Sequence, residues 1–426
     1  MRGLHENWLQ HQALILDRLI MVKIYFHRIV LLLLVFVMMT GCTEQYMLQT
    51  NTFDDALVVE ATITNELKKQ EIKLTRTFRF EQTAPLAETG ANVFVTDSDG
   101  QQYDFEEVSG KYISTAEFQA IAGKTYRLNI TTQDGRTYNS SGETLSAVNE
   151  MESVVPTVET RNGQRGVSII VNSFDPAAAS KYYRYEYEET YKIIAPKWDD
   201  NMLIMAPGPE IGQPEVITLV PRTGGETRTC YKTERSTDIL LTSTIGLTED
   251  RVRFSPRFLS IQDPIIAHRY SILVRQYVQN LASYTFYKTL KNLSGSGSIL
   301  SQNQPGFFYG NMKSVSNPNE KVIGFFDVAS VSSKRIFFNF IDLFPLDPLP
   351  PYFQNCESKI YGDCLIETDP NCRGNELRSV IRNKFMLYFS DLFYAEGGYR
   401  IYYMVVPPCG DCTKLSPNII PSFWID

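Results

Sequence analysis

The most obvious chemical potential in this chain lies in a Cys-x-x-Cys pair near its C-terminus, Cys409 and Cys412. Such a pair can form half of a zinc site, act as a redox centre, or supply two ends of structural disulfides. The remaining cysteines are Cys42, Cys230, Cys356, Cys364 and Cys372. The choice among the three chemistries depends on the redox compartment of the chain and on the other ligands that it offers.

The N-terminal region predicts export and lipid attachment. Basic residues precede an apolar run from Ile29 to Met39, which is shorter than the roughly 20 residues of a membrane-spanning helix but typical of a signal peptide. The run ends in Thr40-Gly41-Cys42, which resembles the lipobox of bacterial lipoproteins, where the cysteine is acylated. We therefore expect residues 1–42 to be a lipoprotein signal peptide with lipidation at Cys42, and we take Met21 as the candidate translation start.

Lipidation would anchor the protein to a membrane, because more than one acyl chain gives stable attachment. Thr43 rather than Asp follows the cysteine, so the common inner-membrane retention signal is absent and the outer membrane is favoured. The sequence leaves open whether the protein faces the periplasm or the cell surface. The net charge of −7, without a basic stripe, argues against nucleic acid as a partner.

An exported chain with six cysteines besides Cys42 predicts up to three disulfides. His268 is the one histidine beyond residue 42, so a zinc site of two cysteines and two histidines is excluded. The Cys-x-x-Cys pair follows two prolines, whereas a thioredoxin-like site sits where a strand feeds a helix. We expect Cys409 and Cys412 to bind the C-terminal tail to the Cys356–Cys372 loop or to Cys230, and we predict no metal and no cofactor.

Alternating polar and apolar residues predict an all-β fold. Alternation runs through LVVEATIT at 57–64 and through both sides of Asp134-Gly135, a strong hairpin signal. After a tether at 43–53, turns every 8–12 residues or so predict an immunoglobulin-like β-sandwich at 54–147. A larger β-rich domain at 160–426 should follow, with one short helix near 281–292. Residues 146–158 are interpreted as a connector and residues 195–228 as a long loop.

A tyrosine stripe on the predicted strand at 181–194 is the candidate ligand surface. Tyr183, Tyr185 and Tyr187 share one face, opposite Arg184, Glu186 and Glu188. Aromatic faces stack on ligands, so the stripe could bind a carbohydrate or peptide; burial inside the sandwich is the alternative.

Enzymatic motifs are missing or incomplete. AGKT at 122–125 lacks the earlier glycine of a phosphate loop, and DSDG at 97–100 lacks the later ligands of a calcium loop. There is no G-x-S-x-G, and His268 has no second histidine for H-E-x-x-H. We predict no catalytic residues, although paired carboxylates of a hydrolase stay an open alternative.

An ordered set of segments resembles a family of Bacteroidota lipoproteins that carry domain of unknown function 4249. The segments are the lipobox at Cys42, LVVEATIT at 57–64, AGKTYRLNITTQDGRTYNS at 122–140, YYRYEYEETYKIIAP at 182–196, YSILVRQYVQNLASYTFYKTL at 270–290, NPNEKVIGFFDVASVSSKRIFF at 317–338, and the ending CGDC…PSFW at 409–424. The resemblance implies an outer-membrane lipoprotein encoded near a TonB-dependent receptor.

From these observations we expect a non-enzymatic accessory or ligand-binding component that works with such a receptor. An envelope scaffold is the second hypothesis, and a carboxylate-based hydrolase is the third.

Overall fold

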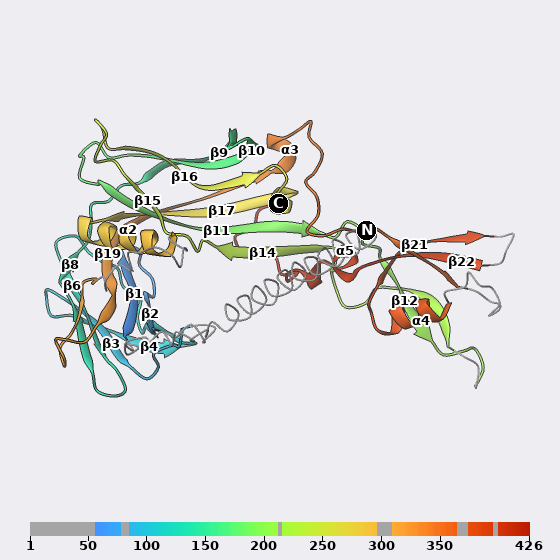
Figure 1. Ribbon diagram of the computed structural model, residues 1–426, viewed down its shortest axis with the longest axis horizontal. Coiled ribbons are helices and arrows are strands. Elements are labelled where there is room, and N and C mark those ends of the chain that lie inside the picture. The colour runs from blue at the N-terminus through green and yellow to red at the C-terminus, as the bar shows by residue number, and fades with distance from the viewer. Residues whose placement is uncertain (1–55, 78–84, 212–214, 296–308, 364–373, 395–398) are drawn as a thin grey trace, which may run out of the picture. The chain divides into compact units, whose positions relative to one another are not determined.

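The computed structural model describes residues 56–77, 85–211, 215–295, 309–363, 374–394 and 399–426 (Figure 1). The predicted signal peptide, Cys42 and the tether lie outside these residues. Residues Asp54–Asp426 form one compact unit. Within the described ranges, no helix combines the length and the apolar character that a membrane span needs.

The first eight strands are β1 (Leu57–Thr64), β2 (Glu71–Arg76), β3 (Asn92–Asp97), β4 (Gln102–Val108), β5 (Lys111–Ser114), β6 (Thr125–Thr131), β7 (Thr137–Ser140) and β8 (Glu143–Thr144). They are followed by β9 (Met151–Arg161), β10 (Gln164–Phe174), β11 (Tyr182–Ile194), β12 (Asn201–Ala206), β13 (Val216–Pro221), β14 (Thr229–Arg235), β15 (Leu240–Ser243), β16 (Arg251–Ser260) and β17 (Arg269–Gln279). The last strands are β18 (Met312–Ser314), β19 (Val322–Asn339), β20 (Lys359–Asp363), β21 (Leu387–Tyr394) and β22 (Tyr399–Val405). The helices are η1 (Pro264–Ile266), α2 (Leu281–Gly295), α3 (Phe340–Leu343), α4 (Gly374–Arg382), α5 (Pro407–Gly410) and η2 (Cys412–Lys414).

The all-β prediction is confirmed, and the alternation in β1 shows why. Leu57, Val59 and Ile63 are buried in the core of the N-terminal sheet, whereas Glu60 on the opposite face is exposed. Because successive side chains of a strand point to opposite faces, this pattern can be satisfied only by a sheet with one face on a core. The predicted hairpin at Asp134-Gly135 joins β6 to β7, with Gly135 at a φ of 84° that favours glycine.

The long strand β19 joins the N-terminal strands to the rest of the molecule. Its first half, Val322–Ala329, pairs with β1 in parallel, and its second half, from Ser330, pairs with β17 in the antiparallel sense. A 14-stranded sheet results, in the order β14-β11-β17-β19-β1-β2-β5-β4-β3-β6-β7-β18, with β15 on β11 and β8 on β6. The pairing thus crosses the predicted boundary between 54–147 and 160–426; the division into two domains stays a prediction.

A second layer, formed by β16, β10 and β9, lies against the β11–β17 part of the large sheet, and the two layers enclose a common core (Figure 1). The connector predicted at 146–158 was wrong in its second half, because β9 begins at Met151. This strand has only a weak period of its own, with exposed Val155 and Val158. It forms because β10 offers a complete antiparallel edge over 11 residues.

The remaining strands form a C-terminal layer with α4. The predicted loop at 195–228 was also wrong, because it contains the β12–β13 hairpin. Leu203, Met205 and Leu219 from this hairpin pack with α4 and the β20-β22-β21 sheet. The hairpin therefore depends on apolar partners that lie more than 100 residues further along the chain.

The predicted short helix is α2. Asn280 caps it, since its side-chain Oδ1 accepts a hydrogen bond from the backbone N–H of Ser283 at 2.8 Å. This cap fixes where the helix begins against β19, and so it determines which side chains the helix presents to the neighbouring sheet.

Candidate ligand pocket

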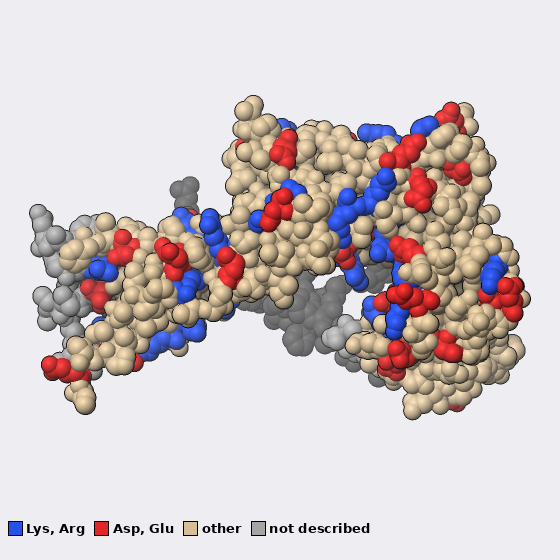
Figure 2. All heavy atoms as spheres, turned by 180° about the vertical axis from the view of Figure 1, so that it is seen from behind, with Lys and Arg blue, Asp and Glu red and all other residues tan. Residues whose placement is uncertain are grey.

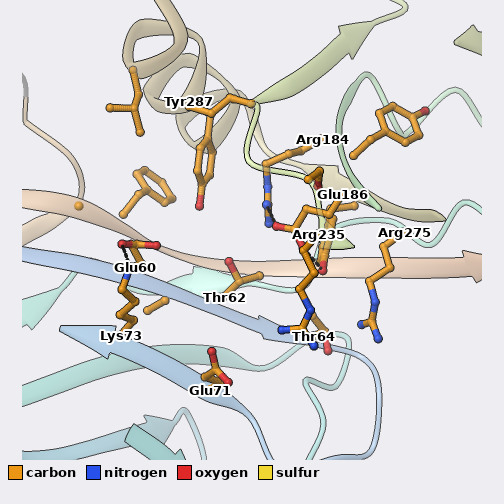
Figure 3. Close-up of a pocket in the computed structure, with 18 of the residues that line it drawn as sticks. Glu60, Thr62, Thr64, Glu71, Lys73, Arg184, Glu186, Arg235, Arg275 and Tyr287 are labelled. Atoms are coloured by element: carbon orange, nitrogen blue, oxygen red, sulfur yellow. Dashed lines mark hydrogen bonds and ion pairs between the residues drawn. The ribbon is translucent and has the colours of Figure 1, made fainter. Parts of the chain in front are cut away.

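A pocket of about 830 Å³ lies where the outer face of β1 and β2 meets β11, β17 and α2 (Figure 3). Thr62 points into it from β1, Arg184 and Glu186 enter from β11, and Tyr287 reaches down from α2. The volume falls in the range of small-molecule sites, which hold roughly 300–1,000 Å³. The strand pairing explains the position, because β19 connects the two parts of the sheet at this point.

Arg184 is the most constrained charged group in the pocket. Its side chain is only 9% exposed, and its guanidinium lies between two rings, 4.3 Å from the centroid of Tyr277 and 4.8 Å from that of Tyr287. Burial alone would lower the pKa of Arg184, but Tyr287 and Glu186 raise it above its ordinary value. The group therefore stays charged, and stacking on both faces fixes its plane.

Glu186 is the direct partner of this guanidinium. Arg184 Nη1 donates to one carboxylate oxygen of Glu186, and the Tyr277 hydroxyl donates to the other at 2.9 Å. Burial would raise the pKa of Glu186, but the charge of Arg184 and the bond from Tyr277 lower it below the ordinary value. Arg184 Nε is buried and has no hydrogen-bond partner among the described residues.

Two further carboxylates near this end are each shared by two cations. Glu66 accepts from Lys68 at 2.5 Å and from Arg275 at 3.1 Å, through the same oxygen. Glu188 accepts from the exposed Arg235 at 3.2 Å and from Arg335 at 3.0 Å. Cations therefore outnumber carboxylates in this network.

The opposite end of the pocket is exposed and balanced in charge. Lys73 pairs with Glu60 across β1 and β2 at 2.9 Å (Figure 3), and Lys111 pairs with Glu71 at 2.6 Å. Exposed pairs of this kind contribute about 0–1 kcal/mol to stability. We therefore treat these ion pairs as the rim of the pocket and not as groups that hold a ligand.

An apolar wall completes the site. Phe286 of α2 lies 5.6 Å from Phe325 of β19, ring centroid to ring centroid, and Leu290 lines the pocket one turn along the helix. Gly324 lies beside Phe325 with a φ of 141°, and a Cβ there would meet the Val59 carbonyl oxygen at 2.2 Å. Only glycine lets β19 approach β1 this closely, so Gly324 fixes the wall in place.

Several observations bear on catalysis in this pocket. A general acid of a glycosidase needs a raised pKa, whereas the pKa of Glu186 is lowered. Asp327 does have a pKa raised by burial, but it is 1% exposed, accepts bonds from Gln279 and Ser283, and does not line the pocket. In the part of the chain that the structure describes, no three His, Cys, Asp or Glu side chains are grouped as a metal ion would require.

The predicted tyrosine surface requires a correction. Tyr183 and Tyr185 are 0% and 1% exposed, and both rings pack in the core between the two sheet layers. Tyr187 is partly buried against the same core. The stripe is therefore a core face, because β9, β10 and β16 cover it, and Tyr183 and Tyr185 offer no stacking surface to a ligand. From this strand the pocket is lined by Arg184, Glu186 and Glu188 of the opposite face, and also by Tyr185 and Tyr187.

The cysteine prediction is confirmed for the four cysteines within the described residues. Cys230 pairs with Cys412 and Cys356 pairs with Cys409, so the Cys-x-x-Cys forms two separate disulfides. Cys42, Cys364 and Cys372 lie outside the described residues.

His268 lies in the bend immediately before β17. It is partly buried, and burial lowers its pKa. It does not line the pocket.

Comparison with models of protein families gives a match. Residues 43–335 match the family model described as Domain of unknown function (DUF4249), which covers more than half of the chain. A comparison with curated proteins found no significant match. The matched region contains every residue that lines the pocket.

Proposed function

This chain belongs to the family of Domain of unknown function (DUF4249), and we propose that it is a non-enzymatic ligand-binding or accessory component of a bacterial outer membrane. The observation that carries this proposal is the pocket of about 830 Å³ at the junction of β1, β11 and α2. It combines a fixed guanidinium with aromatic and aliphatic side chains from α2 and β19, and a placed polar group beside an apolar surface is a feature of ligand sites.

The state of the pocket carboxylates supports binding over hydrolysis. Glu60, Glu186 and Glu188 are each held by a cation, and the lowered pKa of Glu186 keeps it ionised. A hydrolase of the glycosidase type requires one carboxyl group that holds a proton near neutral pH. Glu186 does not meet that requirement, because its pKa is lowered.

The proposed anchor is the lipid on Cys42, and the proposed partner is a TonB-dependent receptor. Support for the anchor comes from the lipobox-like Thr40-Gly41-Cys42 after a short apolar run. Support for the partner comes from the resemblance to Bacteroidota lipoproteins encoded beside such receptors.

Co-purification from native membranes tests this proposal. Tagged protein is isolated in gentle detergent, and its neighbours are identified by mass spectrometry, with Cys42→Ala as the unanchored control. We expect a TonB-dependent receptor to accompany the wild type from the outer-membrane fraction and to be lost with Cys42→Ala, which should itself leave that fraction. Recovery of the wild-type protein alone, from a preparation in which other receptor complexes survive, would contradict the receptor partnership.

A further inference from the structure

We propose that the pocket binds a small organic acid, with its carboxylate at the Arg184 end and its ring or hydrocarbon part against α2. This inference rests on the proposed binding function and names the chemical class of the ligand. It follows from three features of the pocket: the fixed orientation of the Arg184 guanidinium, the local balance of charge, and the position of the apolar wall.

Arg184 is oriented before any ligand arrives. A free arginine loses side-chain freedom and hydration when it binds an anion, and these losses weaken affinity. Here the rings of Tyr277 and Tyr287 and the bond to Glu186 already hold the guanidinium in place. Its Nε–H is buried and has no acceptor among the described residues, so the protein leaves this donor unsatisfied. Guanidinium groups bind carboxylates through paired N–H donors, which makes a carboxylate the matching group.

The charges around Arg184 favour an anion over a cation. The cations that line this end of the pocket are Lys68, Arg184, Arg235 and Arg275, and the carboxylates that line it are Glu186, Glu188 and Asp238. Glu66, just outside the lining, pairs with both Lys68 and Arg275. Glu188 is also engaged by Arg335, which lies outside the lining. The carboxylates of this end are therefore shared among more cations than they can neutralise, and a ligand carboxylate would restore the balance.

The face of the molecule shown in Figure 2 carries, among its described residues, no broad patch of one charge that would attract anions by itself. On this face, Lys and Arg side chains lie interspersed with Asp and Glu. Anion attraction in the pocket therefore depends on the particular residues around Arg184, and single substitutions there should change it.

The apolar wall determines the rest of the ligand. Phe286, Leu290 and Phe325 all line the pocket. Tyr287 reaches into the pocket from α2, and its ring lies against the Arg184 guanidinium (Figure 3). An acid with a flat ring or a short hydrocarbon chain can contact both parts at once. A fully hydroxylated sugar acid would leave its hydroxyl groups against these rings without partners, which costs binding free energy.

Two probes with one ring system test the ligand class. We would titrate the wild-type protein with 2-naphthoate and with 2-naphthalenemethanol, which differ only in the carboxylate, and measure binding by isothermal titration calorimetry. We expect 2-naphthoate to bind one molecule per chain, at least about tenfold more tightly than the alcohol, because charge-assisted hydrogen bonds are the stronger ones. Raising the salt concentration should weaken the naphthoate complex and leave that of the alcohol unchanged.

Three arginine variants locate the site. Arg184→Gln should weaken 2-naphthoate about tenfold or more, and Arg235→Gln, at the 77% exposed rim position, should weaken it by about threefold. Arg251→Gln removes an arginine whose ion pairs are also exposed but which lies outside the pocket lining, so it should leave affinity unchanged. If Arg184→Gln fails to fold, Arg235→Gln against Arg251→Gln still decides the matter.

Equal affinity for the two probes, no binding of 2-naphthoate, or naphthoate affinity unaltered by Arg184→Gln and Arg235→Gln would each overturn the inference. Failure here remains distinguishable from failure of the proposed function. If the alcohol binds the pocket and the acid does not, the binding function stands and only the ligand class falls. If neither probe binds while the receptor still co-purifies, an accessory role remains without this ligand class.

Discussion

The Cys230–Cys412 disulfide offers a direct quantitative test of how the C-terminal tail is held. The bridge closes a sequence separation of 182 residues, for which the chain-entropy relation gives about 5 kcal/mol at 25 °C. Removal of native disulfides costs about 2–5 kcal/mol in practice, because the reduced unfolded chain is not a random coil. We expect the double variant Cys230→Ala/Cys412→Ala to lose an unfolding free energy within that range.

The assay is guanidinium denaturation monitored by tryptophan fluorescence. Trp424 is a suitable reporter, because its ring lies 5.0 Å from that of Tyr231, beside Cys230 on β14. Wild-type protein in a reducing agent should resemble the double variant more closely than the oxidised wild type does. The reasoning would be refuted by a double variant within about 0.5 kcal/mol of the oxidised wild type, or by peptide mapping that found both thiols free.

Two further predictions concern the N-terminal sheet. Gly324→Ala should lower the unfolding free energy by about 1–3 kcal/mol, because its Cβ would overlap the Val59 carbonyl at a φ of 141°, while Gly246→Ala, which meets nothing within 4 Å, should cost much less in the same thermal denaturation assay. Burial would raise the pKa of Asp97, but the bond from Lys124 at 2.7 Å and two backbone N–H groups lower it below 3.8. A lowered folded-state pKa stabilises the protein above the unfolded-state value, so wild-type stability should fall as the pH drops below about 4, and Asp97→Asn should show a smaller fall in urea titrations from pH 6 to pH 3.

Local patterns predicted those parts of the fold whose cause is local. β6 alternates along its whole length and β1 alternates up to Ile63, and Gly135 in the Asp134-Gly135 turn adopts a positive φ, so these elements could be identified from a few residues. The start of α2 depends on Asn280, a neighbour of the helix in sequence. In each case the residues that stabilise the element lie inside it or next to it.

The sequence analysis missed the elements whose stabilising partners lie far away in the chain. β9 is a strand because β10 pairs with it, and the β12–β13 hairpin persists because α4 and β22 cover its apolar side. Their own residues are compatible with a loop as well as with a strand. The sequence led us to expect disulfides from the even number of cysteines beyond Cys42, but which cysteines pair depends on contacts between distant segments.

The candidate site shows what alternation can and cannot predict. It correctly placed Tyr183 and Tyr185 on one face of β11 and Arg184 and Glu186 on the other. What turns that face into a pocket is β19, which pairs with β17 on one half and with β1 on the other. The outward face of the N-terminal sheet thereby meets the charged face of β11, and α2 closes the space between them. Alternation therefore determines which side chains point away from the core. The long-range pairing of strands determines whether those side chains face solvent or face one another across a pocket.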